Sequence, residues 1–219
     1  QINAAGAQRF VEGFDPEKVI AYELGIKSEW LENTLRINAT AFQSTFEDYQ
    51  TQVQQASGAG SIVSNEGEVE TSGIDLNIEA VPVEFLSLTA GVLYLDKAET
   101  SAGPNKGQEL VFAPEFSGTV AATLMLPVAD GGMFLRADYS YMGEHLTNTQ
   151  AVTDTGQTRK TVNATLGWSN EDWRLSVWGK NLNDEAYSGL TASTFSFSGM
   201  DGKFLTPPRT YGASVRYSF

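Results

Sequence analysis

The chain ends with Tyr211-Gly212-Ala213-Ser214-Val215-Arg216-Tyr217-Ser218-Phe219, in which apolar and polar residues alternate without interruption. In a β-strand, successive side chains point to opposite faces, so one face here is aromatic and aliphatic while the other carries serine and arginine. Such a strand separates an apolar environment from a polar one. The same alternation recurs toward the start of the chain, at a length that suits a tilted membrane-spanning strand.

The alternation predicts about nine strands separated by turn-forming residues. They are Val19–Trp30, Thr34–Val53, Ile62–Val81, Leu86–Lys97, Phe116–Val128, Met133–Glu144, Lys160–Trp168, Trp173–Asn181 and Thr210–Phe219. Short connections alternate with long ones, and the long ones are Gln54–Ser61, Ala98–Glu115, His145–Arg159 and Leu182–Arg209. Tight turns at one end and long loops at the other are typical of an outer-membrane barrel, with its periplasmic turns and extracellular loops.

The charged residues of the predicted strands sort to one face. When Tyr22, Leu24 and Ile26 define one face of the first strand, and the analogous register is taken elsewhere, the central parts of that face carry no charge. The opposite face carries Glu23, Lys27, Glu29, Arg36, Asp75, Glu79, Arg136, Asp138, Arg174, Lys180 and Arg216. We therefore expect the first face to contact lipid and the second to face the inside of a barrel.

Aromatic residues on the uncharged face gather at the two ends of the strands. Trp30, Trp168, Trp173 and Phe219 fall at the short-turn ends, whereas Tyr22, Tyr94, Tyr141 and Tyr211 fall at the long-loop ends. Two aromatic girdles are expected where amphipathic rings meet lipid headgroups on both sides of a membrane. The core of a soluble β-sandwich is the alternative, and it explains buried rings but not their sorting.

Composition excludes several classes of protein. The 219 residues include 14 Lys and Arg, 27 Asp and Glu and no Cys, giving a net charge of −13. This charge would repel nucleic acid, and the lack of cysteine excludes disulfides and thiolate sites. No apolar run reaches the roughly 18 residues of a membrane helix. We expect any export signal to lie upstream of Gln1.

Several segments resemble the C-terminal barrel of the TonB-dependent outer-membrane receptors. The resemblance rests on Pro16–Lys18, Tyr22–Lys27, Leu35–Phe42, Glu70–Asp75, Lys180–Tyr187 and Pro207–Phe219, in that order. It implies a barrel of about 22 strands around an N-terminal plug. Residues 1–219 would be the C-terminal part of that barrel, without the plug, the TonB-contacting segment or the first strands.

The resemblance also implies a location and a set of partners. We expect a receptor in the bacterial outer membrane that contacts lipid, the barrel-assembly machinery and, through the missing N-terminal part, the TonB complex. A ferric siderophore is the expected cargo, and carbohydrate or a cobalamin-like compound is the alternative within the family. A passive porin and an adhesin or autotransporter barrel are alternatives outside it. In the family, a final aromatic residue such as Phe219 serves as an assembly signal.

The long segment Leu182–Arg209 is the predicted place for ligand recognition. Its aromatic residues, joined by Lys203, are Tyr187, Phe195, Phe197 and Phe204. Exposed aromatic rings on a loop above a rigid barrel suit ligand stacking, although the same rings could instead pack the loop onto its neighbours. The inward Arg136, Asp138, Arg174 and Arg216 could line a ligand path or contact a plug, or they could pair with one another.

No pattern of residues indicates catalysis, a cofactor or a metal centre. His145 is the only histidine, and we expect it to be solvated in a long loop. Asp154 and Asp201 could offer oxygen atoms to calcium, but no spaced ligand loop surrounds them. Asp184 and Glu185 are adjacent, so in an extended chain they would point to opposite faces, and we expect a turn or an anchor at the rim.

Overall fold

The computed structural model describes residues 13–54, 61–65, 67–148, 154, 156–195 and 200–219. The strands are β1 (Lys18–Trp30), β2 (Leu35–Glu47), β3 (Gln50–Gln54), β4 (Ser61–Asn65), β5 (Glu68–Val83), β6 (Leu86–Ala102), β7 (Phe116–Val128), β8 (Gly131–Met142), β9 (Arg159–Ser169), β10 (Trp173–Lys180), β11 (Ser188–Phe195), β12 (Met200–Leu205) and β13 (Thr210–Tyr217). Within these ranges, no helix has the length and apolarity needed to cross a membrane.

The main element is one nine-stranded sheet with the order β1-β2-β5-β6-β7-β8-β9-β10-β13. Every neighbouring pair in it is antiparallel, and the predicted number of strands is confirmed. β1 and β13 form its two edges, so each is hydrogen-bonded to a neighbouring strand on one side only. The other two sheets are the hairpins β3-β4 and β11-β12.

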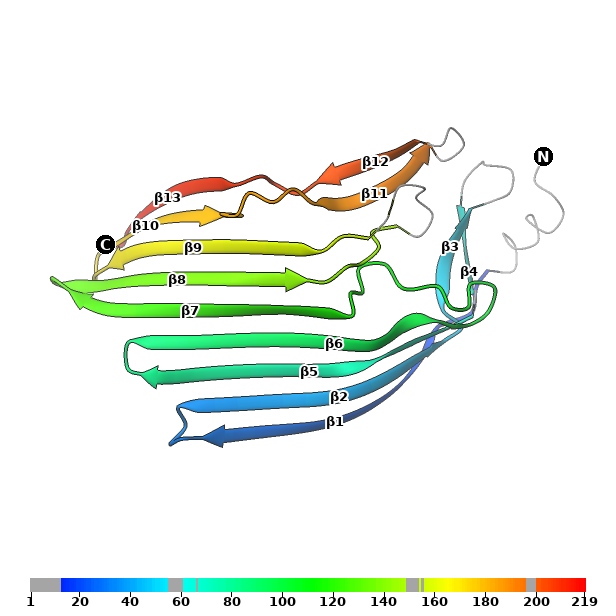
Figure 1. Cartoon of the computed structure of the whole chain (residues 1–219), viewed down its shortest axis with the longest axis horizontal. Helices are drawn as coiled ribbons and strands as arrows, with labels where there is room; N and C mark the ends of the chain where they lie inside the picture. Colours follow the sequence, from blue (N-terminus) through cyan, green and yellow to red (C-terminus); the bar gives the residue numbers. More distant parts are fainter. Residues whose placement is uncertain (1–12, 55–60, 66, 149–153, 155, 196–199) are drawn as a thin grey trace.

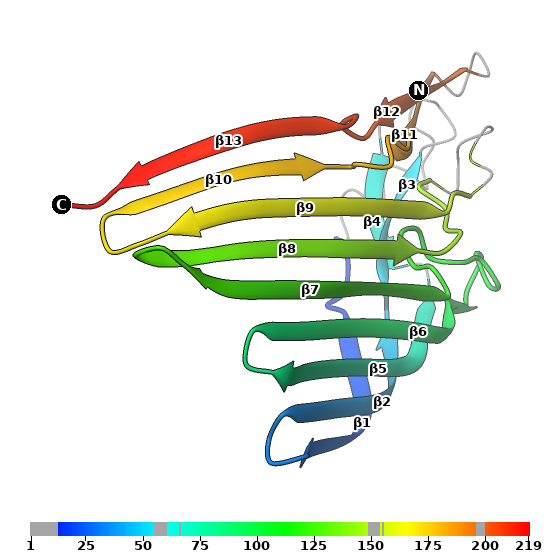
Figure 2. The same cartoon turned by 60° about the vertical axis from the view of Figure 1, so that its left-hand side comes forward.

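The connections sort by length as predicted. Figures 1 and 2 show the short turns β1-β2, β5-β6, β7-β8 and β9-β10 at one end, together with the C-terminus. The long connections and both small hairpins lie at the opposite end. We call these the turn end and the loop end of the sheet.

Two predicted strands are shorter in the main sheet than expected. The predicted strand Thr34–Val53 divides into β2 and β3 at Asp48, which has a φ of 55°. The predicted strand Ile62–Val81 divides into β4 and β5 next to Gly67, which has a φ of 131°. These backbone conformations leave the extended region, so the outer parts turn away and pair with each other as a separate hairpin.

The long connections also contain more regular structure than expected. The predicted loop Leu182–Arg209 contains the hairpin β11-β12, and β6 continues to Ala102 by pairing with the outer part of β5. Both regions consist mainly of polar residues, so they lack the alternation of apolar and polar residues that would predict a strand. Backbone pairing with a neighbouring strand, rather than a buried apolar face, holds them.

The sheet has almost no packed core of its own. Among the described residues, the buried hydrophobic side chains are Val69, Ala121 and Tyr187. Large apolar side chains on the uncharged face are open, including Leu24 at 80% exposure and Val177 at 55%. A soluble sandwich would bury such residues between two sheets, so this single layer needs an apolar solvent on one side.

Aromatic side chains occur at both ends of the strands on the uncharged face. At the turn end the rings of Trp173 and Tyr217 lie with centroids 4.7 Å apart. At the loop end the rings of Phe116 and Tyr141 are 5.8 Å apart. The predicted sorting of tryptophan and tyrosine therefore corresponds to opposite ends of the folded strands.

The charged face has a different construction, in which two large rings lie over glycines. A Cβ atom at Gly212 would meet the Trp178 ring at 2.2 Å, and one at Gly167 would meet the Phe134 ring at 2.4 Å. The Lys180 ammonium nitrogen lies 5.5 Å from the centroid of Trp178, within the range of a cation–π contact. The charged face, which we call the inner wall, is therefore closely packed even at the edge strand β13.

Candidate ligand-binding site

The candidate site lies at the loop end, where the β8-β9 loop meets the hairpin β11-β12. The Asp154 carboxylate organises the loop by accepting four hydrogen bonds. Its Oδ2 accepts from the backbone nitrogens of Thr147 at 2.6 Å and Asn148 at 2.5 Å and from the Thr147 hydroxyl at 2.7 Å. Its Oδ1 accepts from the Gly156 nitrogen at 3.4 Å.

These hydrogen bonds change the acidity of Asp154. Burial alone would raise the pKa of this carboxyl group, but the hydrogen bonds from Thr147, Asn148 and Gly156 favour the charged form and lower the pKa overall. The possible calcium-binding role of Asp154 finds no support in this arrangement, because its oxygen atoms already serve as acceptors for the loop. Among the described residues, no group of three or more acidic or histidine side chains could hold a metal ion.

The loop is joined to the hairpin through fully buried Thr191. The Thr147 hydroxyl donates its single hydrogen to Asp154, so the contact of 2.8 Å between Thr147 Oγ1 and Thr191 Oγ1 requires Thr191 to donate. Asn148 Nδ2 also donates to the Thr191 carbonyl at 2.9 Å. The β8-β9 loop and the hairpin β11-β12 thus share one buried polar network.

Further contacts fix the base of the hairpin to β9. The Tyr187 hydroxyl accepts from the Lys160 nitrogen at 2.5 Å and donates to the Lys160 carbonyl. Arg159 Nη2 donates to the Ser188 carbonyl at 2.9 Å, and the Ser188 nitrogen donates to Gln157 Oε1 at 2.8 Å. Tyr187 is only 7% exposed, so the ring braces the segment, which is the alternative that the sequence left open.

The start of this segment is held at the rim. Asn181 Nδ2 donates to the Glu185 carbonyl at 2.8 Å, and Asn181 Oδ1 accepts from the Glu185 nitrogen at 3.1 Å. Asp184 accepts from the Arg209 backbone and pairs with its guanidinium at 3.1 Å. The adjacent acidic residues thus form a turn that anchors the chain before β13, as the sequence indicated.

The hairpin exposes apolar surface beyond this braced base. Phe204 is 61% exposed and Leu205 is 68% exposed, while Lys203 is also exposed. The Phe195 side chain and all of Phe197 lie outside the described residues. Of the predicted ligand-binding residues, the structure therefore places Phe204 and Lys203 together on an open strand and Tyr187 in the interior. Ligand contact by these residues stays a prediction.

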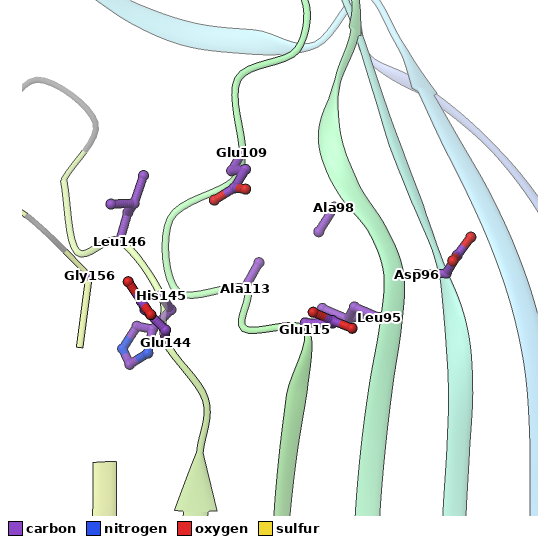
Figure 3. A pocket seen from close by; sticks show the side chains of 10 residues that line it. All are labelled: Leu95, Asp96, Ala98, Glu109, Ala113, Glu115, Glu144, His145, Leu146 and Gly156. Atoms are coloured by element: carbon purple, nitrogen blue, oxygen red, sulfur yellow. The ribbon is translucent and has the colours of Figure 1, made fainter. Parts of the chain in front are cut away.

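A recess with acidic walls lies beside this loop (Figure 3). Its volume is about 360 Å³, and its lining includes Asp96, Glu109, Glu115, Glu144 and His145. The expectation of a solvated histidine is wrong, because His145 is only 4% exposed and its Nδ1 lies 2.8 Å from the Gly143 carbonyl. The Phe112 ring, from the connection between β6 and β7, lies 6.3 Å from the His145 ring, and such a contact between distant segments cannot be read from the local sequence.

Two of the four inward charges, Arg136 and Asp138, have polar side-chain neighbours on adjacent strands. Arg136 Nη1 donates to Thr123 Oγ1 at 3.4 Å, and Asp138 accepts from Asn163 Nδ2 at 2.7 Å. Arg174 and Arg216 stand directly opposite each other on β10 and β13. Whether these four residues line a ligand path, contact a plug or pair with one another stays a prediction.

Comparison with known proteins assigns the family. Residues 2–182 match the model described as TonB dependent receptor-like, beta-barrel. The chain therefore belongs to the β-barrel family of TonB-dependent receptors, which are located in the bacterial outer membrane. The turn end is accordingly the periplasmic end, and the loop end is the extracellular end.

Individual relatives agree with this assignment. A protein of Acinetobacter baumannii described as a probable TonB-dependent siderophore receptor, PiuA, is 28% identical over 89 residues, which are 41% of this chain and 11% of that protein. The crystal structure of FyuA, the ferric yersiniabactin uptake receptor of Yersinia pestis, matches with a TM-score of 0.79 and 23% identity, over 94% of this chain and 30% of FyuA. BauA, the ferric preacinetobactin receptor of Acinetobacter baumannii, matches with a TM-score of 0.66 and 26% identity, again over 94% of this chain and 30% of that one.

Proposed function

We propose that this chain is the C-terminal barrel segment of an outer-membrane receptor that takes up a ferric siderophore with energy supplied through TonB. The family membership and the named functions of PiuA, FyuA and BauA support this proposal. The chain spans less than a third of each of these relatives, so the activity belongs to the whole receptor. Phe219, at the C-terminus, is proposed to serve in assembly of the barrel.

The observation that carries a binding role is the exposed apolar strand on a braced hairpin. Phe204 and Leu205 are open, while contacts of Thr191 and Tyr187 hold the hairpin to the barrel. A rigid base lowers the entropy lost when a ligand binds, and an aromatic ring offers a large contact area. With a net charge of −13, the chain gives an anionic chelate no general attraction, so local contacts must provide the affinity.

Binding can be tested in the full-length receptor with a ferric catecholate as the probe. We expect Phe204→Ala to weaken binding by roughly 1–3 kcal/mol, because a desolvated aromatic contact is lost. Phe85→Ala makes the same chemical change at the periplasmic end, where Phe85 is 49% exposed, and should leave affinity unchanged. Normal affinity of Phe204→Ala, at equal amounts of folded receptor, would remove this strand from the site.

Energy coupling separates a receptor from a passive porin. We expect uptake of the bound chelate into the periplasm to stop when the proton-motive force is dissipated, while binding at the cell surface persists. Continued uptake under those conditions would favour the porin. Binding of a carbohydrate or of cobalamin in place of the ferric chelate would instead favour the alternative cargo within the family.

A further inference from the structure

Phe112, in the long connection between β6 and β7, has a backbone conformation that aromatic residues rarely adopt. Its φ is 57°, in the left-handed region where the Cβ atom of a side chain crowds a backbone carbonyl oxygen. Glycine or asparagine takes such a position in a turn at a lower cost in free energy. The phenylalanine therefore needs a reason beyond the path of the backbone.

The other non-glycine residues with a left-handed backbone in the described part of the chain have local explanations. They are Leu31, Glu32, Asn33, Asp48, Ala129, Asn181 and Asp184. The first three and Ala129 lie in short periplasmic turns, where a tight connection between adjacent antiparallel strands favours positive φ. The remaining three are Asp or Asn, whose short polar side chains tolerate this conformation. Phe112 belongs to neither group.

Contacts with the β8-β9 loop hold Phe112 in this conformation. Its backbone nitrogen donates to the Leu146 carbonyl at 2.8 Å, and its ring centroid lies 6.3 Å from that of His145. An asparagine at this position could donate the same backbone hydrogen bond. Phe112 nevertheless remains 46% exposed, and Val111 beside it is 40% exposed. An exposed apolar side chain is ordinary by itself, but one kept open at the cost of backbone strain is typical of a functional position.

The surroundings of Phe112 indicate what kind of group it contacts. Ala113, the next residue, and Leu146, its hydrogen-bond partner, both line the recess of Figure 3. The carboxylates that line the same recess are those of Asp96, Glu109, Glu115 and Glu144. These carboxylates repel anionic groups, so the part of a molecule that settles beside Phe112 should be uncharged and apolar.

We propose that Phe112 is a cargo-contacting residue whose ring stacks on an uncharged, apolar part of the ferric chelate at the extracellular mouth of the receptor. This inference rests on the proposed transport function and adds the β6-β7 connection to the hairpin β11-β12 as a contact surface. The strained backbone holds the ring in place in the empty receptor, so less conformational entropy is lost when the chelate binds. The ring itself offers a large contact area.

Equilibrium binding to the full-length receptor tests this contact. Wild-type affinity is measured first for a ferric catecholate and for an uncharged ferric trihydroxamate, and the one bound more tightly is the probe for the variants. We expect Phe112→Asn to weaken binding of that probe about tenfold, which corresponds to about 1.4 kcal/mol, because the ring is lost while the left-handed backbone is kept. Phe112→Tyr keeps the ring and should bind almost as the wild type does. Phe85→Asn is the matched control, because it makes the same change at a periplasmic residue that is 49% exposed.

Hydrogen exchange without any cargo separates a cargo contact from a structural one. Asparagine relieves the backbone strain but loses the ring contact with His145, and these two effects on local stability oppose each other. We therefore expect exchange of residues 109–115 and 143–148 in Phe112→Asn to stay close to that of the wild type. Exchange that is roughly tenfold faster in both segments would show that the ring braces the two loops, and it would overturn the proposal.

The binding outcomes also separate this inference from the proposed function. If the wild type binds neither chelate, the proposed function fails and this inference fails with it. If the wild type binds a chelate and Phe112→Asn binds it equally tightly, at equal amounts of folded receptor, only this inference fails. Equal loss of binding in Phe112→Asn and Phe85→Asn would also overturn it, because the effect would not be local to Phe112.

Discussion

Individual glycines on the inner wall decide where its large rings can lie. At Gly212 and Gly167 the lack of a side chain allows Trp178 and Phe134 to cover the neighbouring strand. A Cβ atom at Gly132, elsewhere on the inner wall, would make only an ordinary van der Waals contact, with its nearest heavy atom 3.9 Å away. The inner wall therefore contains glycines that cannot be replaced without moving a ring and glycines that can be replaced by alanine.

Gly212→Ala should displace the Trp178 ring and destabilise the folded barrel by about 1–3 kcal/mol, because overpacking forces side chains away from their preferred positions. Gly132→Ala should have little effect. Denaturant unfolding of the full-length receptor in detergent, followed by tryptophan fluorescence, measures both. Equal stability of the two variants would mean that the contact between Gly212 and Trp178 is not rigid.

At the scale of elements, the extracellular loops form a connected unit. Asp154 organises the β8-β9 loop, and Thr147 and Asn148 join that loop to Thr191 on the hairpin. Tyr187 then ties the start of the hairpin to β9. Movement of one of these loops should therefore disturb the other.

The lowered pKa of Asp154 makes this unit sensitive to acid. A carboxyl group whose pKa is lower in the folded protein stabilises it above the ordinary pKa, and this contribution is lost as the pH falls through the folded pKa. We expect hydrogen exchange of residues 143–148 and 188–191, corrected for the intrinsic rate, to increase in acid. Asp154→Asn should show the faster exchange already at neutral pH.

Asp130→Asn is the matched control, because the carboxylate of Asp130 accepts a hydrogen bond from Asn170 in a periplasmic turn, away from the extracellular unit. This variant should leave exchange in the extracellular unit unchanged at neutral pH. A similar increase in both variants would contradict a specific role for Asp154.

The elements differ in how well the sequence predicts them. β7 matches its predicted bounds because alternating residues such as Val120 and Thr119 contact different environments. The hairpin β11-β12 could not be predicted in this way, because no lipid or core selects one of its faces. The positions of His145, beside Phe112, and of Thr191, beside Thr147, depend on contacts between segments far apart in the chain, and no short motif encodes them.

At the scale of the whole molecule, the sheet depends on two different solvents. Val120 and Thr119 are neighbours on β7, but Val120 lies on the uncharged face and Thr119 lies on the inner face beside Ser140. We expect Val120→Arg to cost about 2–4 kcal/mol if the position is near mid-bilayer, while Thr119→Arg is tolerated. Heat-modifiable gel mobility after refolding into liposomes measures the folded fraction. Equal folding of the two variants would contradict the assignment of Val120 to the lipid face and of Thr119 to the inner face.

The two free edges of the sheet have a consequence for the order of events in time. β1 and β13 each offer a row of backbone groups to a strand that is not among the nine. In hydrocarbon, those groups have no water to bind, so the sheet cannot wait there with its edges open. We therefore expect these nine strands to enter the membrane only together with the strands that pair with β1 and β13, so that no sheet edge meets hydrocarbon unpaired.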